Sequence, residues 1–217
     1  MHGQEVLLTT ESIFRAAFWI LLSGLWVMRV YFMRRVRQGG ERPTLDRKAI
    51  EREGQGLFVG RTLVLLFLAA VLVVYALNPP WLRVFSIPLP DWLRWAGFGL
   101  GLVGLGLWTW TQAVLGKEYS PQLQLRIQHR LVTSGPYAWM RHPMYTAMFG
   151  VGIGLALLTA NWCFVLFAVA MIAGFVIRAP REERMMLEAF GEEYQVYMQR
   201  TGRFFPKFSV LLAGFRR

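Results

Sequence analysis

Five apolar runs constrain this chain more than any other feature of its sequence. They cover approximately Phe14–Phe32, Leu57–Leu77, Trp95–Leu115, Pro143–Leu158 and Trp162–Ile177. A helix needs about 20 mostly apolar residues to cross the hydrocarbon core of a bilayer, and about 17 is the lower limit. The first three runs satisfy this requirement, and the last two lie near the limit. The pattern predicts an all-α integral membrane protein with about five transmembrane helices.

The composition excludes most soluble classes of protein. Hydrophobic residues make up 55% of the chain and charged residues only 17%, whereas a soluble domain carries about 25% charged residues. A disordered chain is excluded for the same reason, because such chains are poor in apolar residues. The single cysteine, Cys163, lies inside an apolar run, so a disulfide within one chain is impossible.

The distribution of basic residues predicts how the helices are oriented. The chain has 24 Lys and Arg residues, and nineteen of them lie in the three segments 34–53, 116–142 and 178–217. With five spans, all three segments lie on one side of the membrane, which the positive-inside rule identifies as cytoplasmic. The amino terminus is then outside and the carboxyl terminus cytoplasmic. This bias explains the net charge of +11 without a nucleic-acid partner. We expect the basic loop formed by residues 34–53 to contact anionic membrane lipids.

Local signals predict how the runs are joined and packed. Asn78-Pro79-Pro80 ends the second run, and only residues 159–161 separate the last two, which indicates a short helical hairpin. Gly97 and Gly101 are four residues apart, so one face of the third helix allows close packing in lipid.

The carboxyl-terminal tail has the pattern of an amphipathic helix. From Arg181 to Arg200, charged residues occupy one side, and the other side carries Met185, Leu187, Phe190, Tyr194 and Tyr197. Such a cytoplasmic helix either lies at the membrane interface or caps the bundle.

The first candidate site lies where the chain enters the fourth helix. Pro143 suits the first turn of that helix, which leaves His142 just outside it in an extended conformation. The free N–H groups at the helix start then form a weak anion site beside the imidazole. The sequence also permits a plainer interpretation, in which His142 only caps the helix at the interface.

The second candidate site opens the tail. Arg178 and Glu182 are four residues apart, so they share one face of a continuous helix. Glu183 lies about 100° around the helix from Glu182, and we expect it to face water. One interpretation is ordinary juxtamembrane charge. The other is a site that holds an anion with Arg178 and a cation with Glu182.

Other kinds of catalytic site find no support in the sequence. The three histidines, His2, His129 and His142, have no spacing that suggests joint metal coordination, and one cysteine cannot complete a zinc site. No serine lies in the context of a nucleophile elbow. We therefore expect no metal.

Several blocks in the carboxyl-terminal half resemble one family in the same order. They are His129-Arg130-Leu131-Val132-Thr133-Ser134-Gly135-Pro136-Tyr137, Arg141-His142-Pro143-Met144-Tyr145, Arg178 with Glu182-Glu183, Phe190-Gly191-Glu192-Glu193-Tyr194, and Arg203-Phe204-Phe205-Pro206. Together they cover roughly residues 119–206 and resemble the isoprenylcysteine carboxyl methyltransferases, which are integral membrane enzymes that use S-adenosylmethionine.

The resemblance implies an activity, a cofactor and a set of site residues. The implied reaction is O-methylation of the carboxylate of a lipophilic, isoprenylcysteine-like substrate, either a small molecule or a lipidated one. The implied catalytic and substrate-carboxylate contact is Arg178. The implied S-adenosylmethionine contacts are Gln122, His129, Arg130, Leu131, Val132, Tyr137, His142 and Glu182. The chain then divides into membrane helices in residues 1–115 and a methyltransferase core in residues 116–217.

Two other activities remain compatible with the same resemblance. Phospholipid N-methyltransferases have look-alike sequences, although an amine acceptor would need a base and would make less use of Arg178. The broad fold is also similar to that of sterol reductases that use NADPH, for which Arg126, Arg130 and Arg141 could bind a 2′-phosphate. A membrane scaffold or transport subunit without a cofactor is the non-enzymatic alternative.

Overall fold

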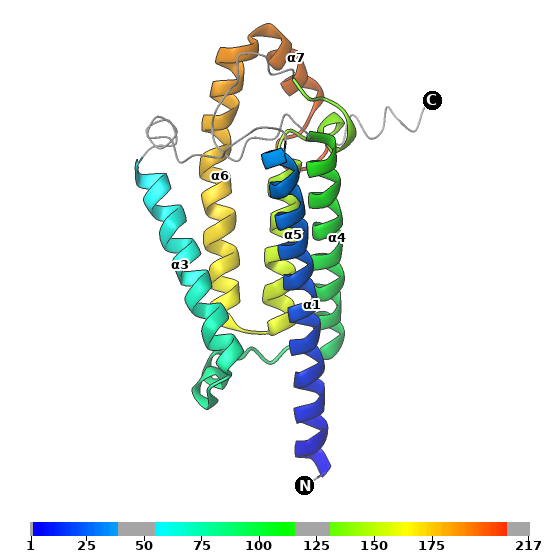
Figure 1. The fold of residues 1–217 in the computed structure, drawn as a ribbon, viewed down its shortest axis with the longest axis vertical. Coiled ribbons are helices and arrows are strands. Elements are labelled where there is room, and N and C mark those ends of the chain that lie inside the picture. The colour runs from blue at the N-terminus through cyan, green and yellow to red at the C-terminus, as the bar shows by residue number, and fades with distance from the viewer. Residues whose placement is uncertain (1, 39–54, 116–130, 208–217) are drawn as a thin grey trace, which may run out of the picture.

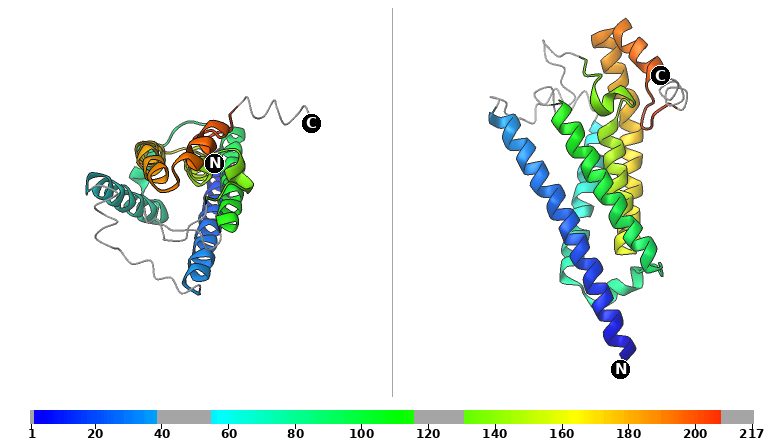
Figure 2. Two further views of the ribbon diagram at one scale, coloured as in Figure 1. Left: turned by 90° about the horizontal axis from the view of Figure 1, so that it is seen from above. Right: turned by 90° about the vertical axis from the view of Figure 1, so that its right-hand side faces the viewer.

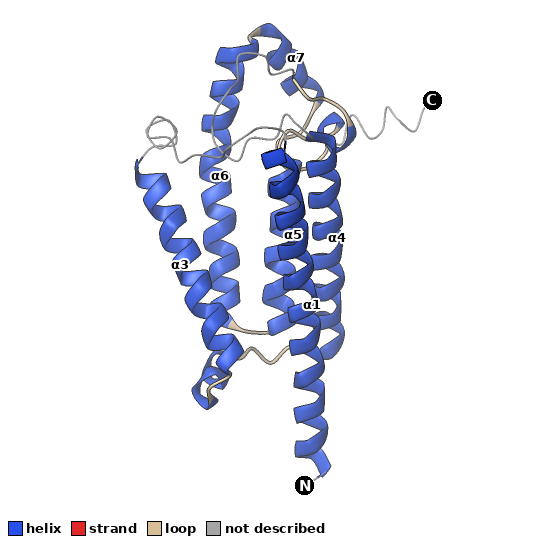
Figure 3. Ribbon diagram, viewed as in Figure 1, coloured by secondary structure: helices blue, strands red, loops and turns tan. Residues whose placement is uncertain are grey.

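The computed structural model describes residues 2–38, 55–115 and 131–207, and this part of the chain is helical, without a β-strand (Figures 1 and 3). The elements in chain order are α1 (His2–Gln38), α3 (Gln55–Leu77), η1 (Pro80–Phe85), α4 (Asp91–Leu115), η3 (Gly135–Ala138), α5 (Pro143–Thr159), α6 (Trp162–Phe190) and α7 (Glu192–Arg200). All five apolar runs form helices, so the predicted all-α membrane fold is confirmed.

Four of these helices are long and apolar enough to cross a bilayer. They are the segments Thr10–Arg35, Gly56–Leu77, Asp91–Leu115 and Trp162–Phe190. The helix α5 is also apolar but has only 17 residues, near the lower limit for a span. The exposed face of the bundle carries many large apolar side chains, such as Leu63, Val103 and Leu166. Such a surface is at home in lipid rather than in water.

The two ends of the bundle differ in what they carry. The amino terminus, η1 and the turn between α5 and α6 lie at one end (Figures 1 and 2). The last turn of α1, the start of α3, η3, α7 and the start of α5 lie at the other. The described basic residues of the predicted cytoplasmic segments, among them Arg34, Arg141 and Arg203, therefore gather at the second end.

Close packing of α4 on α5 depends on glycine. A Cβ atom on Gly104 would lie 2.7 Å from the carbonyl oxygen of Ala147, and one on Gly154 would lie 2.6 Å from that of Gly97. Only residues without a side chain allow two backbones to approach this closely. The close packing expected at Gly97 and Gly101 is thus confirmed: a Cβ on Gly97 would meet α5 at Leu157, and one on Gly101 would meet α1 at Leu21.

The tight hairpin between α5 and α6 is also confirmed. Ala160 ends α5 in the left-handed conformation with φ of 47°. Asn161 then caps α6, because its side chain accepts a hydrogen bond from the Cys163 amide at 2.9 Å. A short polar cap of this kind satisfies an amide at the helix start that lacks a helical partner.

Charged and aromatic side chains join the helices at the amino-terminal end. Arg94 is buried, donates through Nε to the carbonyl of Leu158 at 3.0 Å, and forms an ion pair with Glu11. The Phe18 ring lies 4.6 Å from Tyr75 and 5.3 Å from Phe164. These contacts connect α1, α3, α4, α5 and α6 at the end of the bundle that lies opposite the candidate site.

The prediction of a single tail helix from Arg181 to Arg200 is wrong. α6 continues from the apolar run to Phe190, and Gly191 then turns the chain with φ of 52° before α7 begins. A positive φ favours glycine, because other residues have a Cβ that clashes in this conformation. α6 is therefore both an apolar span and the element that carries the charged candidate site.

Candidate functional site

Arg178 and Glu182 form an ion pair on α6. Arg178 Nε donates to Glu182 Oε1 at 2.7 Å, and the two side chains are 15% and 18% exposed. The hydroxyl of Tyr145, one turn into α5, donates to the same oxygen at 2.6 Å. The predicted shared face of Arg178 and Glu182 is confirmed because α6 runs unbroken through both residues. Tyr145 joins them as a residue for which the sequence indicated no role.

His142 lies beside this pair, at the start of α5. It is the N-cap residue directly before Pro143, as expected, but its backbone, with φ of −121° and ψ of 56°, is not in the extended conformation predicted from the sequence. Its Nδ1 lies 3.5 Å from Glu182 Oε2, and its Nε2 lies 3.4 Å from Glu183 Oε1. The ring stacks on Tyr145 at a centroid distance of 5.2 Å and an interplanar angle of 8°. The imidazole therefore lies between two carboxylates.

Glu183 is buried, which contradicts the expectation that it faces water. Its side chain is only 4% exposed. It accepts hydrogen bonds from Arg141 Nε at 2.7 Å and from Arg203 Nη2 at 2.6 Å. A buried carboxylate is tolerated where cations and hydrogen bonds compensate its charge, and here two guanidinium groups do so.

A signal for this burial was present in the sequence. The buried face of α6 includes Phe164, Ala168, Met171 and Ala179, and the same spacing of three or four residues leads from Ala179 to Glu183. Residues at this spacing share one helix face. Extending the buried face beyond the apolar run would have placed Glu183 inside the structure.

Arg203 and Tyr197 link the carboxyl-terminal segment to this region. The hydrogen bond to Glu183 raises the pKa of Arg203 above its ordinary value. The Tyr197 hydroxyl donates to the carbonyl of Tyr137 at 2.7 Å, and burial raises the pKa of this phenol. Both side chains therefore keep their protons at neutral pH, one as a cation and the other as a hydrogen-bond donor.

The other expected cofactor contacts are distributed along the segment before α5. Leu131 and Val132 are partly buried at the start of the described stretch. Tyr137 lies in η3, which packs against α4, where Val114 and Trp110 lie next to Gly135. The structure places these three residues at the same end of the bundle as Glu182. Gln122, His129 and Arg130 lie outside the described residues.

Arg141 has partners within the protein. Besides Glu183, its Nη1 donates to the carbonyl of Thr201 at 2.6 Å and to that of Met198 at 3.2 Å. Only 8% of its side chain is exposed. This weakens the reductase alternative, because Arg141 was one of three arginines expected to bind a 2′-phosphate. The other two, Arg126 and Arg130, lie outside the described residues.

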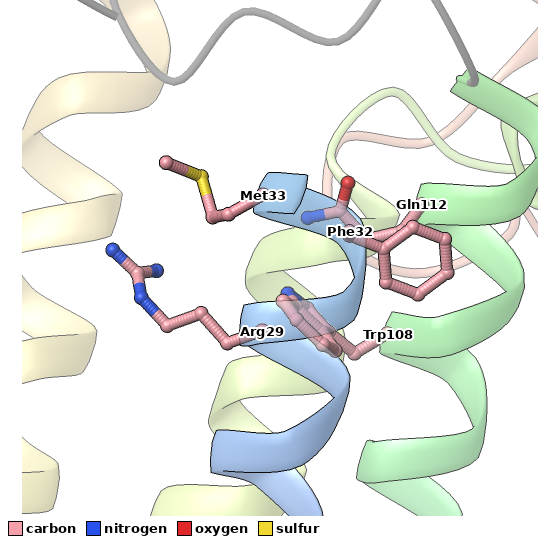
Figure 4. A pocket seen from close by; sticks show the side chains of 5 residues that line it. All are labelled: Arg29, Phe32, Met33, Trp108 and Gln112. Atoms are coloured by element: carbon pink, nitrogen blue, oxygen red, sulfur yellow. The ribbon is translucent and has the colours of Figure 1, made fainter. Parts of the chain in front are cut away.

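A separate shallow depression of about 180 Å³, including its open side, lies between α1 and α4 (Figure 4). It is lined by Arg29, Phe32, Met33, Trp108 and Gln112. In Figure 4 the Arg29 and Met33 side chains extend to the side of α1 away from α4. The depression shares no lining residue with the cluster around Glu182, so it is not part of the candidate site.

The arrangement suits two oppositely charged ligands. A guanidinium can bind a carboxylate through two parallel hydrogen bonds, and a carboxylate can bind an ammonium. Within the described residues, no group of three His, Cys, Asp or Glu side chains is placed to hold a metal ion. The described part of the site can therefore bind and orient ligands of both charges.

Known proteins are similar to parts of this chain. A family model described as phospholipid methyltransferase matches residues 92–193. The protein-S-isoprenylcysteine O-methyltransferase of Rattus norvegicus is 34% identical over 113 residues, which are 51% of this chain and 40% of the rat protein. A nickel-cobalt-cadmium resistance protein of Alcaligenes xylosoxydans xylosoxydans is 29% identical over 123 residues, 55% of this chain and 54% of that protein.

A solved structure shows the same relationship in three dimensions. It is a eukaryotic intramembrane Ras methyltransferase, isoprenylcysteine carboxyl methyltransferase, with a TM-score of 0.50 and 26% sequence identity. The match covers 70% of this chain and 53% of that chain. This chain thus spans about half, or less, of the length of the proteins it matches. The resemblance indicated by the sequence motifs is confirmed.

Proposed function

We propose that this integral membrane protein, which is similar to the isoprenylcysteine carboxyl methyltransferases, transfers a methyl group from S-adenosylmethionine to a lipophilic carboxylate. The observation that carries the proposal is the Arg178–Glu182 ion pair, in which one side chain suits an anion and the other a cation. The proposed substrate is isoprenylcysteine-like, either as a small molecule or on a lipidated protein.

The residues present suit the ammonium group of the methyl donor. Tyr145 and Arg178 both donate to Glu182 Oε1, and His142 Nδ1 lies 3.5 Å from Oε2, the oxygen that we propose for the ammonium. Within the described residues, His142 Nε2 is buried and forms no hydrogen bond, although Glu183 Oε1 lies 3.4 Å away. Buried polar atoms are normally paired, and each exception calls for an explanation. We assign donor binding to Glu182 and His142, with Gln122, His129, Arg130, Leu131, Val132 and Tyr137 as further proposed contacts.

The remaining chemistry is positioning. When bound, S-adenosylmethionine supplies an electrophilic methyl group on a sulfonium. Arg178 binds and orients the substrate carboxylate, which is already ionised at pH 7, so the chain needs no general base. Orientation and removal of water are the contributions that such a site makes to the rate.

The placement of this site in the membrane is part of the proposal. The positive-inside rule puts the basic end of the bundle, and therefore the site, on the cytoplasmic side with the amino terminus outside. α5 has 17 residues, so a lipophilic substrate can approach beside this short helix from the bilayer. The polar donor reaches the same site from the cytoplasm. A rate that did not depend on the length of the substrate's lipid chain would argue against this route.

We propose to divide the chain into two parts by their roles, not by how they fold. Residues 1–115 provide membrane helices, and residues 116–217 carry the methyltransferase core. We do not propose that the two parts fold separately, because α4 of the first part packs closely on α5 of the second.

Phospholipid N-methylation is the second candidate, and the family model with that description favours it. An amine acceptor that is protonated at neutral pH must lose a proton before its nitrogen can attack the methyl group, so Glu182 or His142 would then have to accept it. Arg178 would have no carboxylate to bind. The two candidates therefore make opposite predictions for Arg178 variants.

The test is calorimetric titration of S-adenosylhomocysteine into the full chain in lipid nanodiscs, with NADPH titrated in parallel. Binding of S-adenosylhomocysteine alone supports the proposal. Binding of NADPH alone would assign the protein to the reductase alternative, and no binding of either would favour the scaffold. Methylation assays with a prenylcysteine and with phosphatidylethanolamine then distinguish the two acceptors.

A further inference from the structure

The segment after α7, residues 201–207, returns to cover the start of α5. Arg141 N donates to the carbonyl of Gly202 at 2.9 Å, and His142 N donates to that of Arg203 at 2.9 Å. Gly202 N donates back to the carbonyl of Trp139 at 3.1 Å. A Cβ on Gly202 would lie 1.7 Å from the carbonyl oxygen of Phe205, so the segment requires glycine there.

This segment brings an aromatic side chain onto the candidate site. The Phe204 ring lies 5.8 Å from the His142 imidazole and 5.4 Å from the Phe149 ring. The Thr146 hydroxyl donates to the Phe204 carbonyl. His142 is therefore enclosed by Tyr145 on one side and by the 201–207 segment on another, which leaves 10% of its side chain exposed.

Glu183 is the centre of the contacts that hold the segment in place. It accepts from Arg203 within the segment and from Arg141 beside His142. Arg141 also donates to Thr201, at the end of α7. One buried carboxylate thus connects α6, the residue before His142 and the covering segment. Hydrogen bonds between ionised groups are about twice as strong as neutral ones, so this connection holds the segment more firmly than its neutral backbone hydrogen bonds do.

We infer that Glu183 is a positioning residue, which clamps residues 201–207 through Arg141 and Arg203 and so holds the His142 imidazole beside Glu182. The inference rests on the proposed function, because His142 and Glu182 are the proposed donor-binding pair. Glu183 acts through these neighbours and through its own Oε1, which lies 3.4 Å from His142 Nε2, and it has no direct contact with a ligand in this proposal. Its loss therefore changes donor affinity through the orientation of His142.

The test compares Glu183→Gln with Glu188→Gln in the full chain. Glutamine keeps the shape of the side chain and removes the charge, and Glu188 is an exposed carboxylate on the same helix. The first readout needs no ligand: it is the imidazole NMR signal of His142, one of only three histidines in the chain, assigned with His142→Gln. The second readout is the affinity for S-adenosylhomocysteine, and thermal unfolding controls for stability.

We expect Glu183→Gln to move the His142 signal and to weaken S-adenosylhomocysteine binding by roughly 10- to 50-fold, within the range for a hydrogen bond to a charged group. Glu188→Gln should change neither. An unmoved His142 signal in the folded variant would overturn the inference. So would a moved signal with unchanged affinity.

Two further outcomes are also decisive. If Glu183→Gln does not fold, Arg203→Gln takes its place, because the Arg203 side chain is 43% exposed and its removal leaves Arg141 paired with Glu183. The His142 NMR signal and the affinity for S-adenosylhomocysteine of this variant then support or overturn the inference. If the wild-type protein binds no S-adenosylhomocysteine, the proposed function fails, and the His142 signal alone supports or overturns the clamp.

Discussion

Arg178 and Glu182 are separated by one turn of α6, and Arg178 Nε donates a hydrogen bond to Glu182 Oε1 at 2.7 Å. In the proposed function these two residues bind different ligands, the carboxylate of the acceptor and the ammonium of the methyl donor. In the ion pair, each side chain compensates the charge of the other. The ion pair keeps two charges stable at the edge of an apolar span, and it places the two ligand sites side by side.

Replacing Glu182 with alanine should weaken S-adenosylhomocysteine binding by roughly 10- to 100-fold, because a hydrogen bond to a charged group contributes about 1.5–3 kcal/mol. Calorimetry on the purified protein measures the change. The matched control is Glu188→Ala, on the exposed side of the same helix. Equal affinities in wild type and Glu182→Ala would remove Glu182 from the donor site.

Replacing Arg178 with alanine should lower kcat/KM for a prenylcysteine by roughly 100-fold while changing S-adenosylhomocysteine affinity by less than about threefold. The reason is that a guanidinium binds a carboxylate through charge-assisted hydrogen bonds, whose loss costs several kcal/mol. Arg178→Lys keeps the charge without the planar fork and should recover only part of the rate. Full turnover of the prenylcysteine by Arg178→Ala would contradict the carboxylate role and favour an amine acceptor.

Replacing Tyr145 with phenylalanine tests the contact that the sequence motifs left without a role. The variant keeps the ring that stacks between His142 and Phe175, at 5.2 and 4.3 Å, but removes the hydroxyl that donates to Glu182. We expect donor affinity to fall by roughly 3- to 10-fold with little change in thermal stability. Tyr31→Phe, at an exposed tyrosine on α1, is the control. A large loss of stability without a change in affinity would instead make Tyr145 a packing residue.

Replacing Gly104 with alanine should destabilise the bundle by about 1–3 kcal/mol, the usual cost of overpacking a close contact. The added Cβ would lie 2.7 Å from the Ala147 carbonyl and push α4 away from α5. Gly106→Ala is the matched control, because no atom lies within 4 Å of its Cβ position, and alanine favours the helix. Thermal unfolding in detergent measures both variants, and equal melting temperatures would show that the contact adapts.

Much of the fold could be predicted from the sequence because its signals are local. The apolar runs, the turn at residues 159–161 and the clustering of basic residues each depend on neighbours along the chain, and the structure agrees with them. The pairing of Arg178 with Glu182 was predictable for the same reason, since a continuous helix places residues four apart on one face.

The surroundings of that pair could not be predicted in this way. Tyr145 is 37 residues from Glu182, and Arg141 is 42 residues from Glu183. The prediction of a single tail helix was wrong because Gly191 takes a positive φ, which turns the chain before α7. Helical periodicity places Glu183 on the face of Ala179, but it does not say which partners lie opposite that face.

The sequence by itself thus determined that the chain is a helical membrane protein, that the described basic residues of segments 34–53, 116–142 and 178–217 lie at one end and that Arg178 and Glu182 meet. Only the tertiary structure decided that Glu183 is buried, that two arginines compensate its charge and that residues 201–207 cover His142. The physical reason is that a carboxylate is stable in a buried position only when cations from elsewhere in the fold reach it. Those cations come from Arg141 and Arg203, on segments that only folding brings to α6.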